Sequence, residues 1–129
     1  ATDWSNVDHL LNLIENSLRD ALAAEGERVH VFTHLSHVYG EGSSIYTTYV
    51  FRPGSDYAEA MARWQRLKAA TSRTIAENRG TISHQHGVGR DHAPYLAAEK
   101  GELGMATLRS LATHFDPDQR LAPGVLLQD

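Results

Sequence analysis

The stretch TISHQHGVGRDHAPY, residues 81–95, places three of the chain's eight histidines around a Gly-x-Gly turn. Imidazoles titrate near neutral pH, which suits general acid/base chemistry with a tyrosine such as Tyr46, Tyr49 or Tyr95 as partner. Paired imidazoles also suit a metal ion. An anion site is a third hypothesis, with Arg90 as the charge beside a Gly-rich turn. The fourth is structural, because glycine allows a tight turn between two elements.

Histidine spacing bears on the metal hypothesis. His84 and His86 are two residues apart, so on an extended strand both side chains would point to one face. His34 and His37 are three apart in a predicted hairpin, and this odd spacing would send them to opposite faces. His30 and His34 would share a face but lie far apart along it. Spacing therefore favours only His84 and His86 as a pair.

Composition bounds the class of protein. The chain has 129 residues, of which 41% are hydrophobic and 22% charged, and this is the size of a single domain. The absence of cysteine excludes disulfides and thiolate chemistry. A net charge of −4 argues against a nucleic-acid surface, which would be basic. No apolar run is long enough for a membrane span, so we expect a cytoplasmic protein, membrane-peripheral at most. We expect Arg63 and Arg66 on a solvent-facing side of a helix.

Hydrophobic periodicity predicts the elements that would position these residues. A helix is expected over residues 6–24, with Ser5 as its N-cap and Gly26 beyond its end. Period-two alternation around a GEG turn predicts a β-hairpin over residues 28–52. A capping box, Asp56-x-x-Glu59, opens a second helix. Three further elements complete the prediction: a strand over 81–84, a helical turn entered at Pro94 and a helix over 102–115.

This order of elements predicts an α+β fold, with helices packed on one face of a small antiparallel sheet. A hairpin plus one short strand is a thin sheet for three helices. We therefore expect the chain to be part of a larger protein.

Two stretches resemble a known family. GTISHQHGVGRDHAPYLAAEKGELGM (residues 80–105) and HFDPDQRLAPGVLL (residues 114–127) resemble the C-terminal end of FAD-linked oxidases of the vanillyl-alcohol-oxidase type. Within that group the chain is most similar to the alkyldihydroxyacetonephosphate synthases and their bacterial relatives. The resemblance extends over nearly the whole chain from the first predicted helix and is strongest over residues 80–104.

The resemblance implies a domain organisation. In these enzymes an N-terminal FAD-binding domain precedes a cap, or substrate, domain whose antiparallel sheet lies over the flavin ring. Residues 1–129 would then be a single C-terminal cap domain, without the FAD-binding domain. Its partners would be that domain of the same protein and a small-molecule substrate. Alone the chain would lack FAD and activity, and it would expose an apolar patch through which it could form homo-oligomers.

The resemblance also implies roles for individual residues. The ether-lipid enzymes have a tyrosine in a GACIYF strand that acts as acid or base, and GSSIYT here points to Tyr46. They carry three consecutive histidines where this chain has His84, Gln85 and His86, so the middle histidine is missing. The implied residues are catalytic Tyr46, His84 and His86, cofactor-binding His86, Gly87 and Pro123, and substrate-binding His34, Gln85 and Arg90.

Other functions remain open at this point. His86 also matches the histidine of a Gly-Glu-His-Gly motif in D-lactate, glycolate and D-2-hydroxyglutarate enzymes, some of which bind a divalent metal. In an alignment with those enzymes, His34 matches one metal ligand, but Tyr46 and Gln85 stand in place of the other two, a histidine and a glutamate. We therefore expect no metal site. The alternatives to a synthase-like cap are therefore the cap of an FAD-dependent D-2-hydroxy-acid dehydrogenase or oxidase, a His-based metalloenzyme, and a stand-alone α+β module that binds a small ligand.

Overall fold

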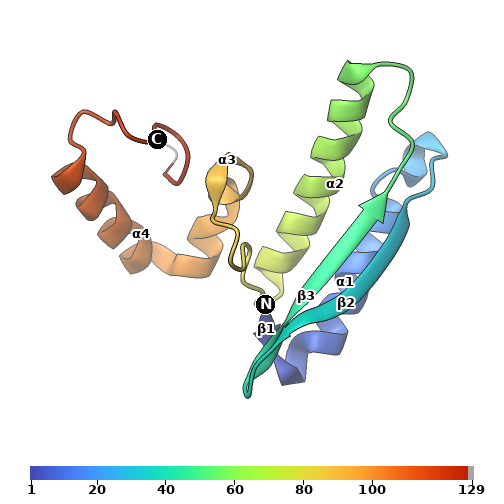
Figure 1. Ribbon diagram of the computed structural model, residues 1–129, viewed down its shortest axis with the longest axis horizontal. Coiled ribbons are helices and arrows are strands. Elements are labelled where there is room, and N and C mark those ends of the chain that lie inside the picture. The colour runs from blue at the N-terminus through green and yellow to red at the C-terminus, as the bar shows by residue number, and fades with distance from the viewer. Residues whose placement is uncertain (128–129) are drawn as a thin grey trace.

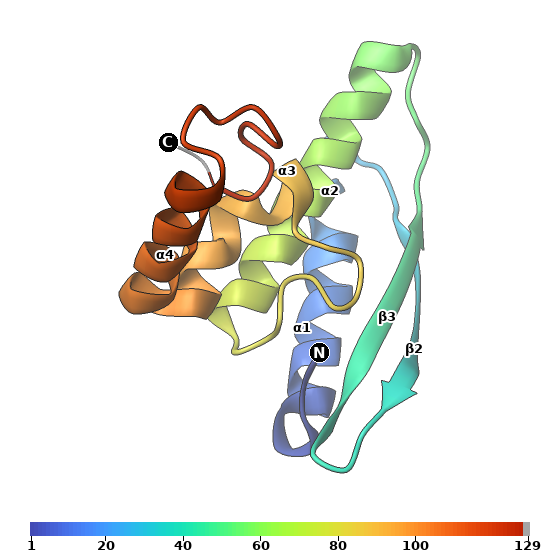
Figure 2. The same cartoon turned by 60° about the vertical axis from the view of Figure 1, so that its left-hand side comes forward.

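The computed structural model describes residues 1–127 and confirms the α+β prediction (Figure 1). Its elements are β1 (Thr2–Asp3), α1 (Trp4–Asp20), η1 (Ala23–Glu25), β2 (His30–Val38), β3 (Gly42–Val50), α2 (Tyr57–Glu77), α3 (Gly89–His92), η2 (Ala93–Tyr95) and α4 (Leu96–Phe115). The strands form one antiparallel sheet in the order β1-β3-β2. The helices lie behind one face of it in successive layers, first α1, then α2, then α4 (Figure 2).

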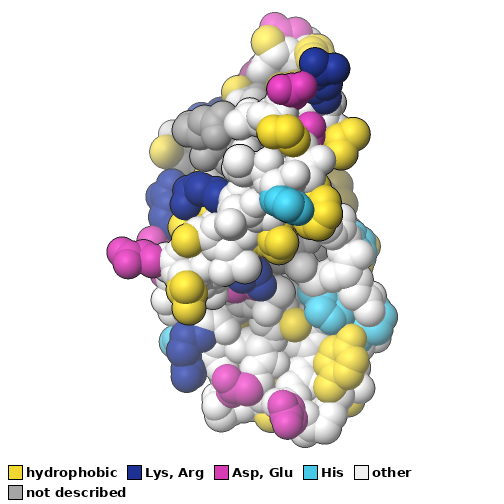
Figure 3. Space-filling view, turned by 90° about the vertical axis from the view of Figure 1, so that its left-hand side faces the viewer, with side chains coloured by type: hydrophobic (Ala, Val, Ile, Leu, Met, Phe, Trp, Pro, Cys, Tyr) yellow, Lys and Arg dark blue, Asp and Glu magenta, His cyan; other side chains and the backbone are white. Residues whose placement is uncertain are grey.

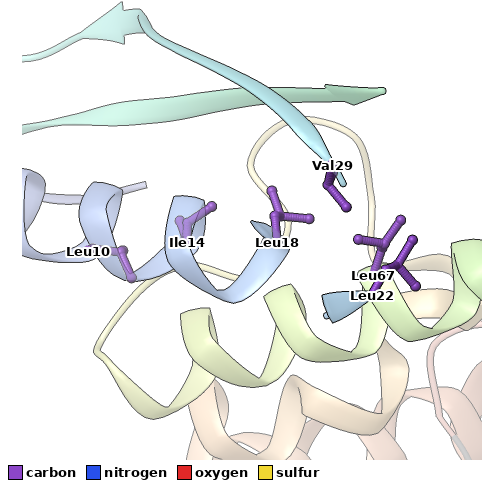
Figure 4. Packing of buried hydrophobic residues seen from close by; sticks show 6 residues of the cluster. All are labelled: Leu10, Ile14, Leu18, Leu22, Val29 and Leu67. Atoms are coloured by element: carbon purple, nitrogen blue, oxygen red, sulfur yellow. The ribbon is translucent and has the colours of Figure 1, made fainter. Parts of the chain in front are cut away.

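The core lies between the sheet and α2, with α1 sandwiched between them (Figure 4). Apolar residues at three-four spacing give α1 a buried stripe, and each fully buried leucine contributes about 2 kcal/mol from the hydrophobic effect. The cluster consists of Leu10, Ile14, Leu18, Leu22, Val29 and Leu67. From the sheet, Val31, Ile45 and Tyr49 pack against it. The opposite face of the sheet is open, and Tyr46 is 47% exposed there.

The first helix begins and ends earlier than predicted. Asp3, in extended conformation, is its N-cap, while Ser5 lies inside the first turn and donates its hydroxyl to the Asp3 carboxylate. The prediction of Ser5 as the cap was therefore wrong. The α-helix ends at Asp20 and a separate 3-10 turn, Ala23–Glu25, follows before Gly26 takes a positive φ of 71°.

The hairpin is confirmed, but it contains a β-bulge that the sequence did not predict. His34 pairs with Tyr46, whereas His37 pairs with Ser44, and Ser36 is the extra residue between the two registers. A bulge shifts the alternation of side chains by one residue. His34 and His37 consequently lie on the same face of the sheet, so the prediction of opposite faces was wrong.

The third strand is not where the sequence placed it. Residues 81–84 form a loop, and the third strand is β1, whose Thr2 pairs with Ser43 and Asp3 with Gly42. A Cβ on Gly42 would lie 2.1 Å from the Thr2 carbonyl oxygen, so this close pairing needs glycine. Thr81 still joins the edge of the sheet, because its N–H donates to the Ala1 carbonyl at 2.8 Å.

Helix α2 begins as predicted, since the Asp56 carboxylate accepts from the Glu59 N–H at 2.8 Å. The expectation for its arginines was wrong for Arg63, which is 6% exposed, and right for Arg66, whose side chain is 50% exposed. Three carboxylates surround the Arg63 guanidinium: Glu25 at 3.1 Å, Glu27 at 3.5 Å and Glu59 at 2.8 Å. Ion pairing with these groups compensates the cost of burying the cation.

Helix α4 starts before the predicted residue 102, at Leu96, and is interrupted at Gly101, which has φ 66° and ψ 178°. Large apolar side chains of this helix are uncovered, since Leu103 is 82%, Leu111 51% and Phe115 76% exposed. Within residues 1–127, no helix combines the length and apolarity that crossing a membrane requires.

Candidate active site

A hollow of about 350 Å³ lies between the hairpin and the loop of residues 81–86. Apolar side chains from the helices, Leu10, Ile14 and Ile75, form part of its lining. In the space-filling view, some histidine side chains gather at the lower right edge of the molecule and others lie apart from them (Figure 3). Five of the residues predicted for the site border this hollow: His34, Tyr46, His84, Gln85 and His86.

Contacts with distant segments hold the loop at the mouth of the hollow. The Ile82 N–H donates to the Glu99 carboxylate at 2.9 Å, which ties the loop to the first turns of α4. Gln85 has a positive φ of 67°, so the chain turns sharply between the two histidines. His84 and His86 are therefore not neighbours on one face of a strand, as the extended interpretation required.

His84 has the most contacts of the predicted catalytic groups. Its Nε2 is 3.1 Å from the Tyr39 hydroxyl, and its ring centroid is 5.4 Å from that of His37. Burial lowers the pKa of His84, and the nearby imidazoles of His37 and His86 lower it further. The lowered pKa favours the neutral imidazole, which can act as a hydrogen-bond donor or acceptor without first losing a proton.

The hairpin contributes an aromatic pair to the same hollow. The rings of His34 and Tyr46, which face each other in the strand register, lie 5.1 Å apart at 31°. Cross-strand neighbours on one face stabilise each other in this way. Both side chains are exposed, so the Tyr46 hydroxyl is accessible to a substrate.

His92 is a residue that the sequence interpretation missed. It borders the hollow from α3, and its Nε2 lies 3.2 Å from the Lys68 ammonium. Its buried Nδ1 has no hydrogen-bond partner among the residues that the structure describes. Burial lowers the pKa of His92, with a further decrease caused by Lys68. His92 is the third histidine of the motif, but its spacing in the sequence did not distinguish it from a surface residue.

The remaining predicted residues lie elsewhere. Gly87 is exposed at the outer end of the loop, and no atom would contact a Cβ built on it. Arg90 lies on α3 beside Gly124 of the C-terminal segment. Pro123 lines a second hollow of about 270 Å³ between α4 and that segment. The structure therefore brings the tyrosine and histidines together and leaves Arg90 and Pro123 outside the hollow.

The lining of the first hollow defines its chemistry. Within the described part of the chain, no lysine, arginine, aspartate or glutamate borders it. The polar side chains are imidazoles, hydroxyls and one amide, which can move or orient protons near neutral pH. No three His, Asp or Glu side chains in residues 1–127 are grouped to hold a metal ion.

Comparison with known proteins gives a consistent family. Residues 1–126 match the family model described as FAD linked oxidases, C-terminal domain. Alkyldihydroxyacetonephosphate synthase of Trypanosoma brucei brucei is 23% identical over 124 residues, 96% of this chain and 20% of that protein. The enzymes of the same name from Dictyostelium discoideum (27% over 103 residues; 80% and 16%) and Caenorhabditis elegans (24% over 126 residues; 96% and 21%) are also similar. The chain spans about a fifth of the length of these curated relatives.

Proposed function

The chain belongs to the family of FAD-linked oxidase C-terminal domains, and we propose that it covers the substrate side of the flavin in an enzyme of the alkyldihydroxyacetonephosphate synthase type. Enzymes of this family are FAD-linked, and this domain is one part of such an enzyme. The relatives that carry the synthase name are much longer than this chain, so the activity is argued from the site itself.

One observation carries the proposal. Tyr46, in the GSSIYT strand, and the histidines of SHQHGVG border the same hollow although the segments are far apart in sequence. These are the two motifs to which the family resemblance assigns proton transfer. Their meeting supports a shared role for Tyr46, His84 and His86.

The polar side chains of the hollow fit the flavin ring of FAD but not its diphosphate. Uncharged polar side chains together with apolar ones suit the flavin ring and the reacting oxygens of a substrate. They do not suit a diphosphate, which is held by a Gly-rich helix N-terminus or by cations. We assign the diphosphate to an N-terminal FAD-binding domain of the same protein and contacts near the ring to His86, with Gly87 and Pro123 contacting FAD from outside this hollow. FAD, when bound, supplies the centre that takes up and returns electrons.

The residues of this chain then divide the proton chemistry. Exchange of an acyl group for an alcohol involves no net oxidation. In this substitution the incoming alcohol must lose a proton, and the leaving group must be stabilised. We propose that the imidazole of His86 accepts the proton of the alcohol and that the Tyr46 hydroxyl acts as the proton donor. The Gln85 amide and the His34 ring orient the substrate. The phosphate of that substrate must be bound outside this hollow, and Arg90 is the candidate from this chain.

The test uses the flavoprotein that contains this chain. It is incubated with an acyl ester of dihydroxyacetone phosphate and a long-chain alcohol, and ether product is measured. Tyr46→Phe should lower the exchange rate by about 10²–10⁴-fold because it removes an acid/base group. Tyr57→Phe is the matched control, since Tyr57 is 80% exposed at the start of α2 and should leave the rate unchanged.

The visible spectrum of the same protein distinguishes the alternatives. Loss of the flavin absorbance on addition of a D-2-hydroxy acid, without ether formation, would replace the exchange by oxidation of that acid. A protein without bound flavin would contradict the cap assignment altogether. Equal rates for the Tyr46→Phe and Tyr57→Phe variants would remove Tyr46 from the catalytic set.

A further inference from the structure

Tyr39 lies beside a histidine that is distant in sequence. It follows β2 at the hairpin turn, and its hydroxyl oxygen is 3.1 Å from Nε2 of His84. Its backbone is fixed on both sides, because its N–H donates to the Gly42 carbonyl at 2.8 Å and its carbonyl accepts from the Trp4 indole N–H at 3.1 Å. The phenol is therefore presented to the loop from a rigid turn.

A second ring restrains the same phenol. His37 stacks on Tyr39 with ring centroids 6.4 Å apart and an interplanar angle of 14°. His37 is itself held by the bulge, since its Nδ1 is hydrogen-bonded to the Ser36 hydroxyl at 3.1 Å. The bulge thus aligns the ring that packs against Tyr39. Tyr39 and His84 meet edge to face, with centroids 5.9 Å apart at 67°.

The direction of the hydrogen bond follows from the chemistry of the two groups. A neutral imidazole has one acceptor nitrogen and one N–H, and the partner of one nitrogen decides where the proton sits. A phenol is the more acidic donor of the two, so the Tyr39 hydroxyl donates and Nε2 of His84 accepts. The proton of His84 then lies on Nδ1.

We propose that Tyr39 is a positioning residue that holds His84 as the Nδ1–H tautomer, so that His84 acts as a hydrogen-bond donor to the substrate. The role in catalysis rests on the function proposed for this site, whereas the tautomer itself does not. His86, the other histidine of the motif, is then left as the proton acceptor. Nε2 of His84 is occupied by the Tyr39 hydroxyl and cannot serve as a base.

The tautomer can be measured directly by NMR of the 129-residue chain with ¹⁵N-labelled histidine, using long-range ¹H–¹⁵N correlations at pH 7.5. The His84 signals are assigned by their loss in His84→Asn. Wild-type His84 should show the proton on Nδ1. Tyr39→Phe keeps the ring and the backbone contacts, and it should shift His84 towards the Nε2–H tautomer and raise its pKa. Tyr57→Phe should change neither.

The groups facing His84 are Tyr39 and His37 from the hairpin, His86 from its own loop and the amino terminus of Ala1. A pKa change confined to Tyr39→Phe therefore cannot come from the other three. An unchanged tautomer and pKa in Tyr39→Phe would overturn the inference.

The flavoprotein provides the catalytic readout. Tyr39→Phe should lower kcat/KM at pH values above the pKa of His84, where the neutral ring loses its Nδ1–H donor to the other tautomer, and Tyr57→Phe should not. A changed tautomer with an unchanged kcat/KM would overturn the donor role of His84 in catalysis while the Tyr39 contact stands. Absence of exchange in the wild-type flavoprotein would instead count against the proposed function, so the two failures are distinguishable.

Discussion

Arg63 offers the sharpest test of the packing that supports the site. It is a buried cation on α2 whose guanidinium contacts three carboxylates from two segments and donates to the Arg52 carbonyl at 2.8 Å. Because Arg52 follows β3 by two residues, this contact ties the far end of the hairpin to α2. Replacement by methionine, Arg63→Met, keeps the length of the side chain and removes the charge.

The expected loss is set by what the substitution leaves behind. Removing one partner of a buried ion pair costs about 3–5 kcal/mol, because the remaining charge is uncompensated. The side chains of Glu25, Glu27 and Glu59 are 25%, 21% and 36% exposed, so water can reach them in part. We therefore expect the lower end, about 3 kcal/mol in the free energy of unfolding. For a chain of this size that is a decrease in Tm on the order of 10 °C.

The neighbouring arginine provides the control. Arg66 pairs with the same Glu25 at 2.7 Å, but its side chain is half exposed. Exposed pairs contribute about 0–1 kcal/mol, so Arg66→Met should change the stability little. Urea unfolding followed by circular dichroism measures both variants. Equal unfolding free energies for the two would refute the argument that burial makes Arg63 matter.

Three further predictions concern the sheet, the core and the effect of pH. Gly42→Ala should destabilise the chain and separate β1 from β3, because the new methyl group would overlap the Thr2 carbonyl, and Gly40→Ala, where the space is open, should not. Leu67→Ala should cost about 2–5 kcal/mol by leaving a cavity at a fully buried position, whereas Leu103→Ala, on the exposed side of α4, should change stability by less than about 0.5 kcal/mol. The folded state lowers the pKa of His84 and His92, so below about pH 6.5 the unfolded chain binds more protons and stability should decrease as the pH falls.

Each of these has a direct readout. Loss of the Thr2–Ser43 pairing would appear as faster amide exchange at the β1-facing edge of β3 in Gly42→Ala. If the amides exchanged at the same rate in Gly42→Ala and Gly40→Ala, the predicted overlap would be contradicted. A small effect of Leu67→Ala would mean that the core relaxes around the missing side chain. The unfolding midpoint in urea measured between pH 5 and pH 7.5 should vary less in a His84→Asn, His92→Asn double variant, and an unchanged slope would assign the effect to other groups.

Elements defined by local patterns could be predicted from the sequence. The hairpin follows from alternation around one glycine turn, and the start of α2 follows from the Asp56 cap. β1 could not be predicted, because two residues carry no periodicity and their pairing depends on the close approach allowed by Gly42. The burial of Arg63 was also hidden, since only its i,i+4 neighbour Glu59 is local and the other carboxylates come from a turn far along the chain.

The site shows the same division between local and distant information. Motifs made Tyr46, His84 and His86 the candidate site residues, because these residue types carry chemistry wherever they lie, and the structure brings all three to one hollow. They did not identify Tyr39 or the shared face of His34 and His37, because both depend on where the bulge at Ser36 sets the register. A one-residue shift at that bulge would turn His37 away from Tyr39 and the loop while leaving the sequence motifs intact. The bulge therefore belongs to the site as much as the histidines do, since it determines which side chains the loop meets.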